Sequence, residues 1–285
     1  QMLVAYLGPK GSFTHHVALE SFQDADLCPY GSITEVIKAY EREQVDYAVI
    51  PVENSIEGSV HETIDYLFHQ ANFQAIAEVV FPIKQQLLAC SMERPIEVIY
   101  SHPQALAQGK AYIQEHFPHA RLEMTTSTSY AARYVSQHPE LPIAAIAPLE
   151  AKNEYGLIVV ARDIQEMDKN YTRFWILGRS SYQVSPSLKV DVQKVSLGIT
   201  LPSDVAGSLC QALSTFANRE LNLTKIESRP LRTALGEYFF IIDILERQAE
   251  LLEDAFEELD SLGVHIKILG QYSVYMLKEN ETEKE

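Results

Sequence analysis

The sequence predicts an α/β protein whose chain forms two folded regions. Over about the first 180 residues, short apolar runs alternate with helix-like segments, a pattern typical of a largely parallel sheet. The Ser-rich stretch 180–190 has little periodicity and indicates a linker. Beyond it the predicted elements follow the order βαββαβ, which is the ferredoxin-like arrangement. A length of 285 residues agrees with two domains.

In the first region, apolar runs predict the strands and the residues beside them predict where helices begin. The runs are 2–8, 47–52, 98–103, 143–148 and 172–178. The third run leads into a helix that has Pro103 in its first turn. Ser32 and Glu35 form a capping-box pattern, and the apolar residues that follow Ser32 recur at helical spacing.

The second region carries every element that the βαββαβ order requires. Strands are predicted at 195–200, 223–227, 238–245 and 264–277. The first helix is indicated by Val205, Leu209, Leu213 and Phe216 on one face, and the second by the apolar residues within 251–262. Gly263 suits the position after the end of the second helix.

Composition excludes several classes of protein. Hydrophobic residues make up 46% of the chain and charged residues 22%, as in a folded protein with a core. The net charge of −16 disfavours nucleic-acid binding, because the chain repels phosphate backbones. No uncharged apolar run approaches the roughly 18–20 residues that span a bilayer. We therefore expect no membrane partner. Three widely spaced cysteines argue against a disulfide framework, so we expect a cytoplasmic protein.

Small polar residues gather at four predicted strand-to-helix junctions, at 8–13, 53–55, 101–105 and 125–129. A helix N-terminus has unpaired N–H groups and a partial positive charge, so it binds carboxylates. Four such helix ends around one cleft would hold a dianion with few cations. The alternative is that the Ser, Thr and Asn side chains are only helix caps. For one cluster the cap is the better explanation, but it weakens for four clusters in one region.

A fifth polar cluster, NYTRF at 170–174, opens the last strand of the first region. Arg173 offers a fixed fork of donors that suits a carboxylate. Thr172 places a hydroxyl donor beside it. Taken alone, a Thr-Arg pair at the start of a strand is more often structural than functional, so its meaning depends on the other clusters.

Six segments of the first region resemble the prephenate dehydratase family in their order and approximate spacing. They are GPKGSF (8–13), PVENSIEGSV (51–60), SHPQALAQ (101–108), STSYAA (127–132), YGL (155–157) and NYTRF (170–174). In the second region, AGSL (206–209) and NLTKIESRP (222–230) resemble the amino-acid-binding ACT regulatory domain. One departure is that Gly207-Ser208-Leu209 stands where Gly-Ala-Leu is commoner. The similarity extends from Leu3 to about Leu277.

The resemblance implies a two-lobed catalytic domain that is similar to periplasmic-type binding proteins. This domain is expected at 1–180, with lobes of about 1–78 plus 158–180 and about 79–157, and with the site between them. A linker at 181–193, an ACT domain at 194–278 and a charged tail at 279–285 complete the expected organisation. Lobes of this kind close by hinge motion.

The resemblance also implies the reaction, which removes water and CO₂ from prephenate and gives phenylpyruvate in L-phenylalanine biosynthesis. Thr172 falls on the family's catalytic threonine and is expected to protonate or hydrogen-bond the departing hydroxyl. Arg173 is expected to pair with a substrate carboxylate. The other expected substrate-binding residues are Phe174, Asn54, Ser55, Ser101, Gln104, Ser127, Thr128 and Ser12. No cofactor or metal is expected, because the reaction involves neither redox chemistry nor hydration of an unactivated bond.

The ACT domains of this family bind L-phenylalanine between subunits, so we expect phenylalanine to inhibit the protein and the chain to form a homodimer or homotetramer. The expected effector-binding residues are Gly207, Ser208, Leu209, Asn222, Leu223 and Thr224. We expect the first three in the first turns of a helix. A glycine there suggests close approach of a ligand or a partner chain, or packing against a neighbouring strand.

Three questions stay open from the sequence. Arogenate, which has an amine in place of the keto group, is an alternative substrate, and no residue is predicted to distinguish it from prephenate. A non-catalytic binding or sensing protein would have the same domains, although it has no use for a hydroxyl acid at Thr172. His102 either donates to the substrate or caps a helix, whereas Glu53 is expected to stay away from a dianionic substrate.

Overall fold

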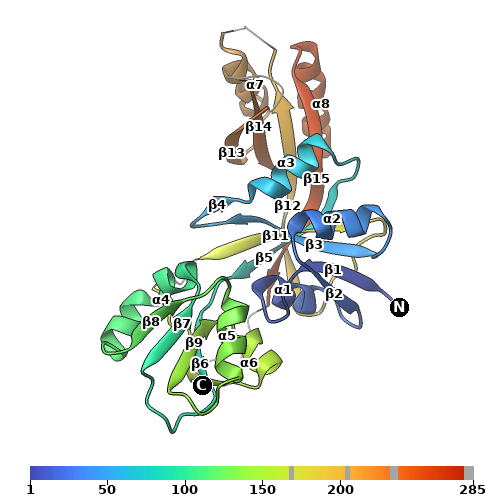
Figure 1. Ribbon diagram of the computed structural model, residues 1–285. Helices are drawn as coiled ribbons and strands as arrows, with labels where there is room; N and C mark the ends of the chain where they lie inside the picture. The colour runs from blue at the N-terminus through green and yellow to red at the C-terminus, as the bar shows by residue number, and fades with distance from the viewer. Residues whose placement is uncertain (167–169, 203–205, 232–236, 279–285) are drawn as a thin grey trace. The chain divides into compact units, whose positions relative to one another are not determined.

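The computed structural model describes residues 1–166, 170–202, 206–231 and 237–278 (Figure 1). Their contacts divide the chain into two compact units: unit 1 comprises residues 1–60 and 80–174, and unit 2 comprises residues 61–79 and 175–285. Strands β5 (Ala75–Pro82) and β11 (Tyr171–Gly178) run through the boundaries, so each contributes residues to both units. The predicted domain limits do not coincide with this division and stay predictions. No helix in the described residues is long and apolar enough to cross a membrane.

The first lobe of unit 1 is built on parallel strands. These are β1 (Leu3–Leu7), β2 (Asp26–Tyr30) and β3 (Tyr47–Asn54), and the short β4 (Gly58–Ser59) pairs antiparallel with β3. β1 lies between β2 and β3 and pairs in parallel with both, and β11 follows β3 in the strand order. Helices α1 (Phe13–Ser21) and α2 (Ile33–Glu41) connect these strands. Because β1 and β3 are parallel, their carboxyl ends lie at the same edge of the sheet.

Helix α2 begins where the capping-box pattern predicts. Ser32 Oγ accepts a hydrogen bond from the backbone N–H of Glu35 at 3.1 Å. The Glu35 carboxylate reaches back to the N–H of Gly31 at 3.0 Å, one residue before the N-cap. The first contact satisfies an N–H group that a helix start leaves unpaired, and the second satisfies the N–H just before the N-cap. Val36 and Ile37 are fully buried, so the predicted apolar face is the one that packs on the sheet.

The second lobe of unit 1 has a mixed sheet in the order β10-β6-β9-β7-β8. The strands are β6 (Gln86–Ala89), β7 (Val98–Ser101), β8 (Arg121–Met124), β9 (Ile143–Ala147) and β10 (Ile158–Ala161). β7 is parallel to β8 and β9, whereas β6 is antiparallel to β9 and β10. Helices α4 (Pro103–His116), α5 (Thr128–Ser136) and α6 (Glu150–Tyr155) complete the lobe. The pairing of β10 with β6 puts 158–161 in this lobe, one strand beyond the predicted limit at 157.

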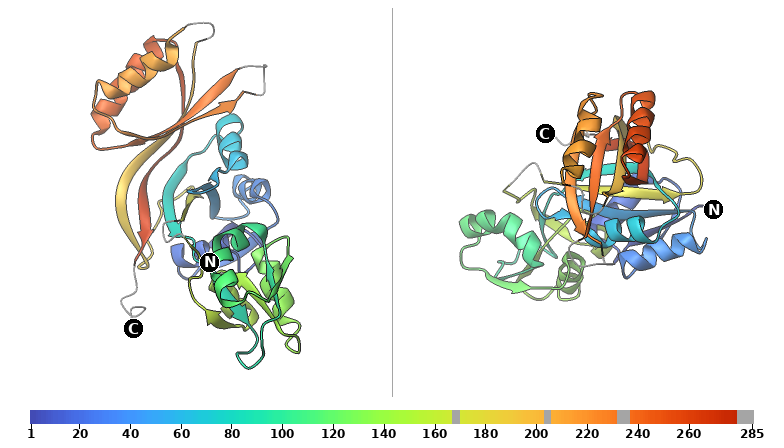
Figure 2. Two further views of the ribbon diagram at one scale, coloured as in Figure 1. Left: turned by 90° about the vertical axis from the view of Figure 1, so that its left-hand side faces the viewer. Right: turned by 90° about the horizontal axis from the view of Figure 1, so that it is seen from above.

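Unit 2 contains the βαββαβ order predicted from the sequence. Its elements are β12 (Leu188–Thr200), α7 (Ser208–Ala217), β13 (Leu223–Pro230), β14 (Tyr238–Leu245), α8 (Ala249–Ser261) and β15 (His265–Leu277). The strand order is β13-β14-β12-β15 with β5 beyond β15, and the pairs β13–β14, β14–β12 and β12–β15 are antiparallel. Figure 2 shows α7 and α8 on one face of this sheet. β12 begins at Leu188, inside the predicted linker 181–193, because Leu188 pairs with Leu277 at the far end of β15.

Helix α3 (His61–His69) packs on the strands of unit 2. The Phe68 ring stacks on Phe239 with 3.9 Å between centroids. A Cβ on Gly198 of β12 would lie 2.4 Å from the Phe68 ring, so this approach requires glycine. Arg229 of β13 binds Asp65 of α3 through two hydrogen bonds of 3.1 and 2.7 Å. The arginine of the ESRP segment therefore has a structural partner on α3.

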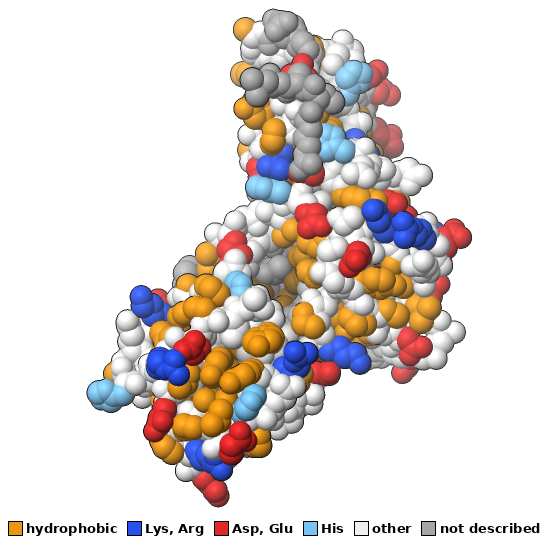
Figure 3. Space-filling view, in the orientation of Figure 1, with side chains coloured by type: hydrophobic (Ala, Val, Ile, Leu, Met, Phe, Trp, Pro, Cys, Tyr) orange, Lys and Arg blue, Asp and Glu red, His pale blue; other side chains and the backbone are white. Residues whose placement is uncertain are grey.

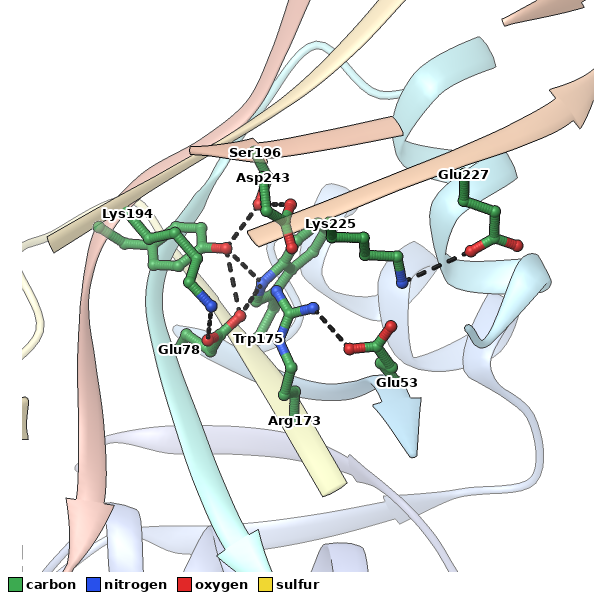
Figure 4. A network of polar contacts seen from close by, with 10 residues as sticks. Glu53, Glu78, Arg173, Trp175, Lys194, Ser196, Lys225, Glu227 and Asp243 are labelled. Atoms are coloured by element: carbon green, nitrogen blue, oxygen red, sulfur yellow. Dashed lines mark hydrogen bonds and ion pairs between the residues drawn. The ribbon is translucent and has the colours of Figure 1, made fainter. Parts of the chain in front are cut away.

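A buried polar network, the Tyr272 network, joins five strands of unit 2 (Figure 4). Its members are Glu78 on β5, Trp175 on β11, Lys194 and Ser196 on β12, Asp243 on β14 and Tyr272 on β15. The Tyr272 hydroxyl lies at its centre, 2.6 Å from Ser196 Oγ, 3.1 Å from Trp175 Nε1 and 3.2 Å from Glu78 Oε1. Ser196 Oγ in turn donates to Asp243 at 2.6 Å. Buried polar groups of this kind fix one arrangement of the strands, because breaking any contact leaves a desolvated group unpaired.

Candidate active site

The polar segments predicted from the sequence lie at the carboxyl ends of parallel strands in both lobes of unit 1. In the first lobe these are the segment after β1 and the segment after β3. In the second lobe, Ser101 ends β7 and Ser127 follows β8, the two strands being parallel neighbours. Open α/β sheets bind ligands at this edge. On the face drawn in Figure 3, the surface is hollowed between the two lobes.

Thr172 is held by Asn54 from the neighbouring strand. Asn54 Nδ2 donates to Thr172 Oγ1 at 3.0 Å. The Asn54 amide is fixed in turn, because its Oδ1 accepts hydrogen bonds from the backbone N–H groups of Ile56 at 2.9 Å and Glu57 at 3.1 Å. The Thr172 oxygen therefore accepts from Asn54, and its own hydrogen is directed elsewhere. Thr172 is 8% exposed, so this hydroxyl lies in a largely desolvated position.

Ser55 and Asn170 form a second pair beside the first. Ser55 Oγ accepts from the N–H of Tyr171 at 2.9 Å and donates to Asn170 Oδ1 at 3.0 Å. The Ser55 N–H donates to the Tyr171 carbonyl at 2.8 Å. We call Asn54, Ser55, Asn170 and Thr172 the β3–β11 cluster. Asn170 stands in the NYTRF segment but was not among the predicted site residues, because the sequence does not reveal that it faces Ser55.

Arg173 forms an ion pair with Glu53, with 2.9 Å between Nη1 and Oε1. Side chains alternate between the two faces of a strand, so Arg173 leaves β11 on the face opposite Thr172 and Phe174. Glu53 and Asn54 alternate on β3 in the same way. Phe174 is 2% exposed and belongs to the core. The binding of a substrate carboxylate by Arg173 stays a prediction; in the structure its guanidinium neutralises Glu53.

Several of the predicted binding residues act as helix N-caps. Ser12 Oγ accepts from His15 N–H at 3.2 Å, Ser127 Oγ from Tyr130 N–H at 3.0 Å, and His102 Nδ1 from Gln104 N–H at 3.2 Å. These contacts are the capping roles that the sequence left open. The caps use the side chains but leave other N–H groups of the first turns available to a ligand.

The remaining predicted residues of the second lobe differ in exposure. Ser101 is buried and donates to the carbonyl of His102 at 2.8 Å, so it shapes the turn into α4. Gln104 is exposed and Thr128 is half-buried, each in the first turn of its helix. Substrate binding by Ser101, Gln104 and Thr128 stays a prediction.

His15 stabilises the segment after β1 through a hydrogen bond and a ring contact. The Gly11 N–H donates to His15 Nδ1 at 2.8 Å, and the imidazole stacks on Tyr6 with 5.0 Å between ring centroids. Burial lowers the pKa of His15 below its ordinary value, against the opposing charges of Glu154 and Glu150. The neutral ring is the form that accepts the Gly11 hydrogen bond, so the low pKa and the contact agree.

The predicted effector residues lie at two places in unit 2. Gly207 is the N-cap of α7 with φ of +80°, and Ser208 is the first residue of the helix. The expectation that Gly207 lies within the first turns is therefore wrong by one residue, and its reason for being glycine is the left-handed backbone. An added Cβ at Gly207 would meet no atom of the described chain within 4 Å.

The other effector residues, Asn222 to Thr224, lie at the start of β13, with Leu223 half-buried between two exposed neighbours. A groove of about 460 Å³ between α7 and α8 includes Gly207 but none of the other predicted effector residues. Its walls come from one side of α7 and the residues at its two ends, together with Glu258 and Leu262. Effector binding at the predicted residues stays a prediction.

The fold and the site together define a class of protein: a two-lobed α/β domain with a hydroxyl oriented at the edge of its sheet, joined to a ferredoxin-like domain. The family model for prephenate dehydratase matches residues 4–182, and that for the ACT domain matches residues 195–261. The chain therefore belongs to the prephenate dehydratase family and carries a C-terminal ACT domain.

Individual relatives agree with this assignment. The prephenate dehydratase of Lactococcus lactis subsp. lactis is 50% identical over 280 residues, which is 98% of this chain and 100% of the relative. The X-ray structure of prephenate dehydratase from Streptococcus mutans is 42% identical with a TM-score of 0.63, covering 96% of this chain and 100% of that one. The structure of the Arthrobacter aurescens prephenate dehydratase in complex with L-Phe is 32% identical with a TM-score of 0.81, covering 95% of this chain and 90% of that one.

Proposed function

We propose that this protein removes water and CO₂ from prephenate to give phenylpyruvate, and that the Thr172 hydroxyl assists the departure of the leaving oxygen. The observation that carries this proposal is the 3.0 Å hydrogen bond from Asn54 to Thr172 Oγ1. Because Asn54 donates, the threonine hydrogen is free to point at a substrate oxygen. A binding protein has no need for a hydroxyl oriented in this manner.

The chemistry requires a proton donor at one place only. As the ring C–O bond breaks, the electrons of the bond to the departing CO₂ move into the ring, which becomes aromatic. The leaving hydroxide takes up a proton and departs as water. A threonine is a weak acid, so it acts by orientation, and the hydrogen bond from Asn54 stabilises negative charge on its oxygen in the transition state.

The substrate carries two carboxylates, which the protein must bind despite its own negative charge. The N-terminal N–H groups of α1, α4 and α5 are suited to this task, because they bind anions without adding mobile cations. In this proposal Ser12, Ser101 and Ser127 hold the helix starts in place, and Gln104 and Thr128 contact the substrate. Arg173 contributes a positive charge, and its ion pair with Glu53 reduces the net charge that the substrate meets there.

We propose further that L-phenylalanine binds the ACT domain and inhibits the reaction. The support is the ACT domain of this chain and the L-Phe complex named for the Arthrobacter aurescens relative. In this proposal the effector binds near the start of α7 and the start of β13 of two subunits, so the protein works as a homodimer or homotetramer.

The test is the formation of phenylpyruvate from prephenate, followed by the absorbance of phenylpyruvate in base. Thr172→Ala is expected to fold and to lose about 10²–10⁴-fold in kcat, the usual contribution of a general acid. Thr172→Ser is expected to retain more activity than Thr172→Ala, because the hydroxyl survives. An alanine variant with more than about a third of the parent rate would remove Thr172 from the mechanism.

A further inference from the structure

Asn170 has a buried hydrogen-bond donor that the described part of the chain leaves without a partner. The residue is 2% exposed, and its Nδ2 makes no hydrogen bond there. Ser55 Oγ already accepts from Tyr171 N–H, so its own hydrogen goes to Asn170 and the atom of Asn170 that faces Ser55 is the carbonyl oxygen. The NH₂ group therefore points away from Ser55. A desolvated amide without an acceptor is unfavourable, and a bound ligand can supply the acceptor that the described residues do not.

The position of Asn170 relates this donor to the site. Asn170 immediately precedes β11 and stands two residues before Thr172, so both side chains leave the same side of the strand. Thr172 contacts Asn54 at the end of β3, and Asn170 contacts Ser55, the next residue along the chain. Two residues of extended chain span about 6.6 Å, a distance comparable to that across a six-membered ring with its two para substituents.

The chemistry of the substrate supplies an acceptor at that distance. In prephenate the ring carbon para to the hydroxyl bears both groups that contain a carboxylate. If Thr172 contacts the hydroxyl, a donor about one ring away meets a carboxylate oxygen. A neutral amide is suited to this end of the molecule, because a carboxylate that leaves as CO₂ loses its charge. A cation paired with that carboxylate would stabilise the charged ground state more than the transition state and so slow the reaction.

We propose that Asn170 Nδ2 donates a hydrogen bond to a carboxylate oxygen of the substrate at the ring carbon opposite the leaving hydroxyl. This inference rests on the proposed function, because it assumes that Thr172 faces that hydroxyl. Asn170 and Thr172 then bind the two ends of the ring, and the Asn54–Ser55 segment fixes the spacing between them. Ser55 acts through Asn170 as a positioning residue.

The main test is Asn170→Asp, which keeps the oxygen that accepts from Ser55 and replaces the NH₂ by a second carboxylate oxygen. At pH 8 this variant is expected to lose about tenfold to a hundredfold in kcat/KM, the usual effect of losing a hydrogen bond to a charged group. Burial raises the pKa of a carboxyl group, and a protonated aspartic acid donates again. The loss is therefore expected to shrink as the pH falls, which a merely structural role would not produce.

The matched control is Asn153→Asp, the same change at an exposed position of α6 in the same unit. It is expected to keep kcat/KM within about twofold, because exposed charges are screened by solvent. Binding is separated from turnover in a Thr172→Ala background, where calorimetry with prephenate is expected to give a Kd that Asn170→Asp raises about tenfold or more.

An Asn170→Asp variant that folds, with kcat/KM within about threefold of the parent and an unchanged pH profile, would overturn the inference but not the proposed function. If this variant does not fold by circular dichroism, Asn170→Ser takes its place. An unchanged prephenate Kd in Thr172→Ala/Asn170→Ser would then overturn the inference. A parent protein that releases no phenylpyruvate from prephenate would overturn both.

Discussion

Asn54 determines which way the Thr172 hydroxyl points, because its amide can only donate to that oxygen. The orientation of the amide is set by two backbone N–H groups, those of Ile56 and Glu57, which occupy its carbonyl oxygen. An aspartate at this position would keep those two contacts. Its other oxygen would accept the Thr172 hydrogen and so withdraw it from the substrate.

We therefore predict that Asn54→Asp folds with nearly unchanged stability but loses at least about tenfold in kcat, because an oriented donor has been reversed. The measurement pairs phenylpyruvate release with a urea titration of the unfolding free energy. Addition of Asn54→Asp to Thr172→Ala is expected to cost little more, because the hydroxyl that it redirects is gone. Additive losses in the double variant would contradict this account.

His15 makes the segment after β1 sensitive to pH. Its pKa in the folded protein lies below its ordinary value of about 6.5, first because it is buried. The folded state thus binds fewer protons than the unfolded state, and stability is lost as the pH falls from about 6.5 through the lowered value. Protonation also removes the acceptor for the Gly11 N–H.

We predict that the unfolding free energy decreases between pH 7.5 and pH 5.5, and that His15→Asn reduces this decrease. An asparagine oxygen can still accept from Gly11 but does not titrate in this range. The measurement is urea unfolding of both proteins at the two pH values. Identical pH dependence in parent and variant would show that other groups are responsible.

The residues of the site could be predicted from the sequence, whereas most of the contacts between them could not. Thr172, Asn54 and Ser55 were predicted, and the structure brings them together at the ends of β3 and β11. The Arg173–Glu53 pair and the Asn170 contact were not predicted, because they depend on which strands are neighbours and on their register. The capping roles of Ser12 and Ser127 were left open, since a cap and an anion site use the same residue types.

At the scale of elements, the order of strands and helices was predictable because each carries a local pattern. The strand predicted at 238–245 matches β14, whose apolar run is interrupted only by Asp243. The start of β12 was missed because residues 189–194 are mostly polar and exposed, and only pairing with β15 makes them a strand. Similarly, the predicted lobe limit at 157 separates β10 from β6, its partner in the sheet, because this non-local pairing leaves no local pattern in the sequence.

The N-terminus of α7 provides a test of effector binding that separates charge from backbone strain. Gly207→Asp places a carboxylate where we expect that of phenylalanine to bind, and it is expected to raise the inhibitory concentration of phenylalanine about tenfold or more while basal turnover is kept. Gly207→Asn has nearly the same shape and the same cost at φ of +80°, without the charge. It is expected to stay closer to the parent.

The measurement is activity against phenylalanine concentration for the three proteins. Equal curves for the aspartate and asparagine variants would show that charge at this turn does not matter. A parent indifferent to phenylalanine would exclude regulation by this amino acid.

At the scale of the whole molecule, β11 carries both Thr172 of the candidate site and, three positions further along, Trp175 of the Tyr272 network. Thr172 contacts Asn54 in unit 1, and Trp175 of the same strand donates to Glu78 and to Tyr272 in unit 2. Tyr272 and its partners Ser196 and Asp243 belong to the strands of the βαββαβ domain. A change in the packing of those strands therefore has a route along β11 to Thr172, and we expect any coupling between the proposed effector and the reaction to follow this strand.

We predict that Tyr272→Phe weakens inhibition by phenylalanine while basal turnover stays near that of the parent. The change removes the hydroxyl that bridges Ser196, Trp175 and Glu78, and it is expected to lower the unfolding free energy by about 1–3 kcal/mol because their polar atoms lose a buried partner. Trp175 is the sole tryptophan, so its emission reports the altered network directly. Tyr275→Phe deletes a hydroxyl from the same strand outside the network and serves as the control.

Tyr272→Phe would contradict this account if it changed the tryptophan emission and the stability but not the inhibition by phenylalanine. The network would then hold the strands together without transmitting the effector's signal.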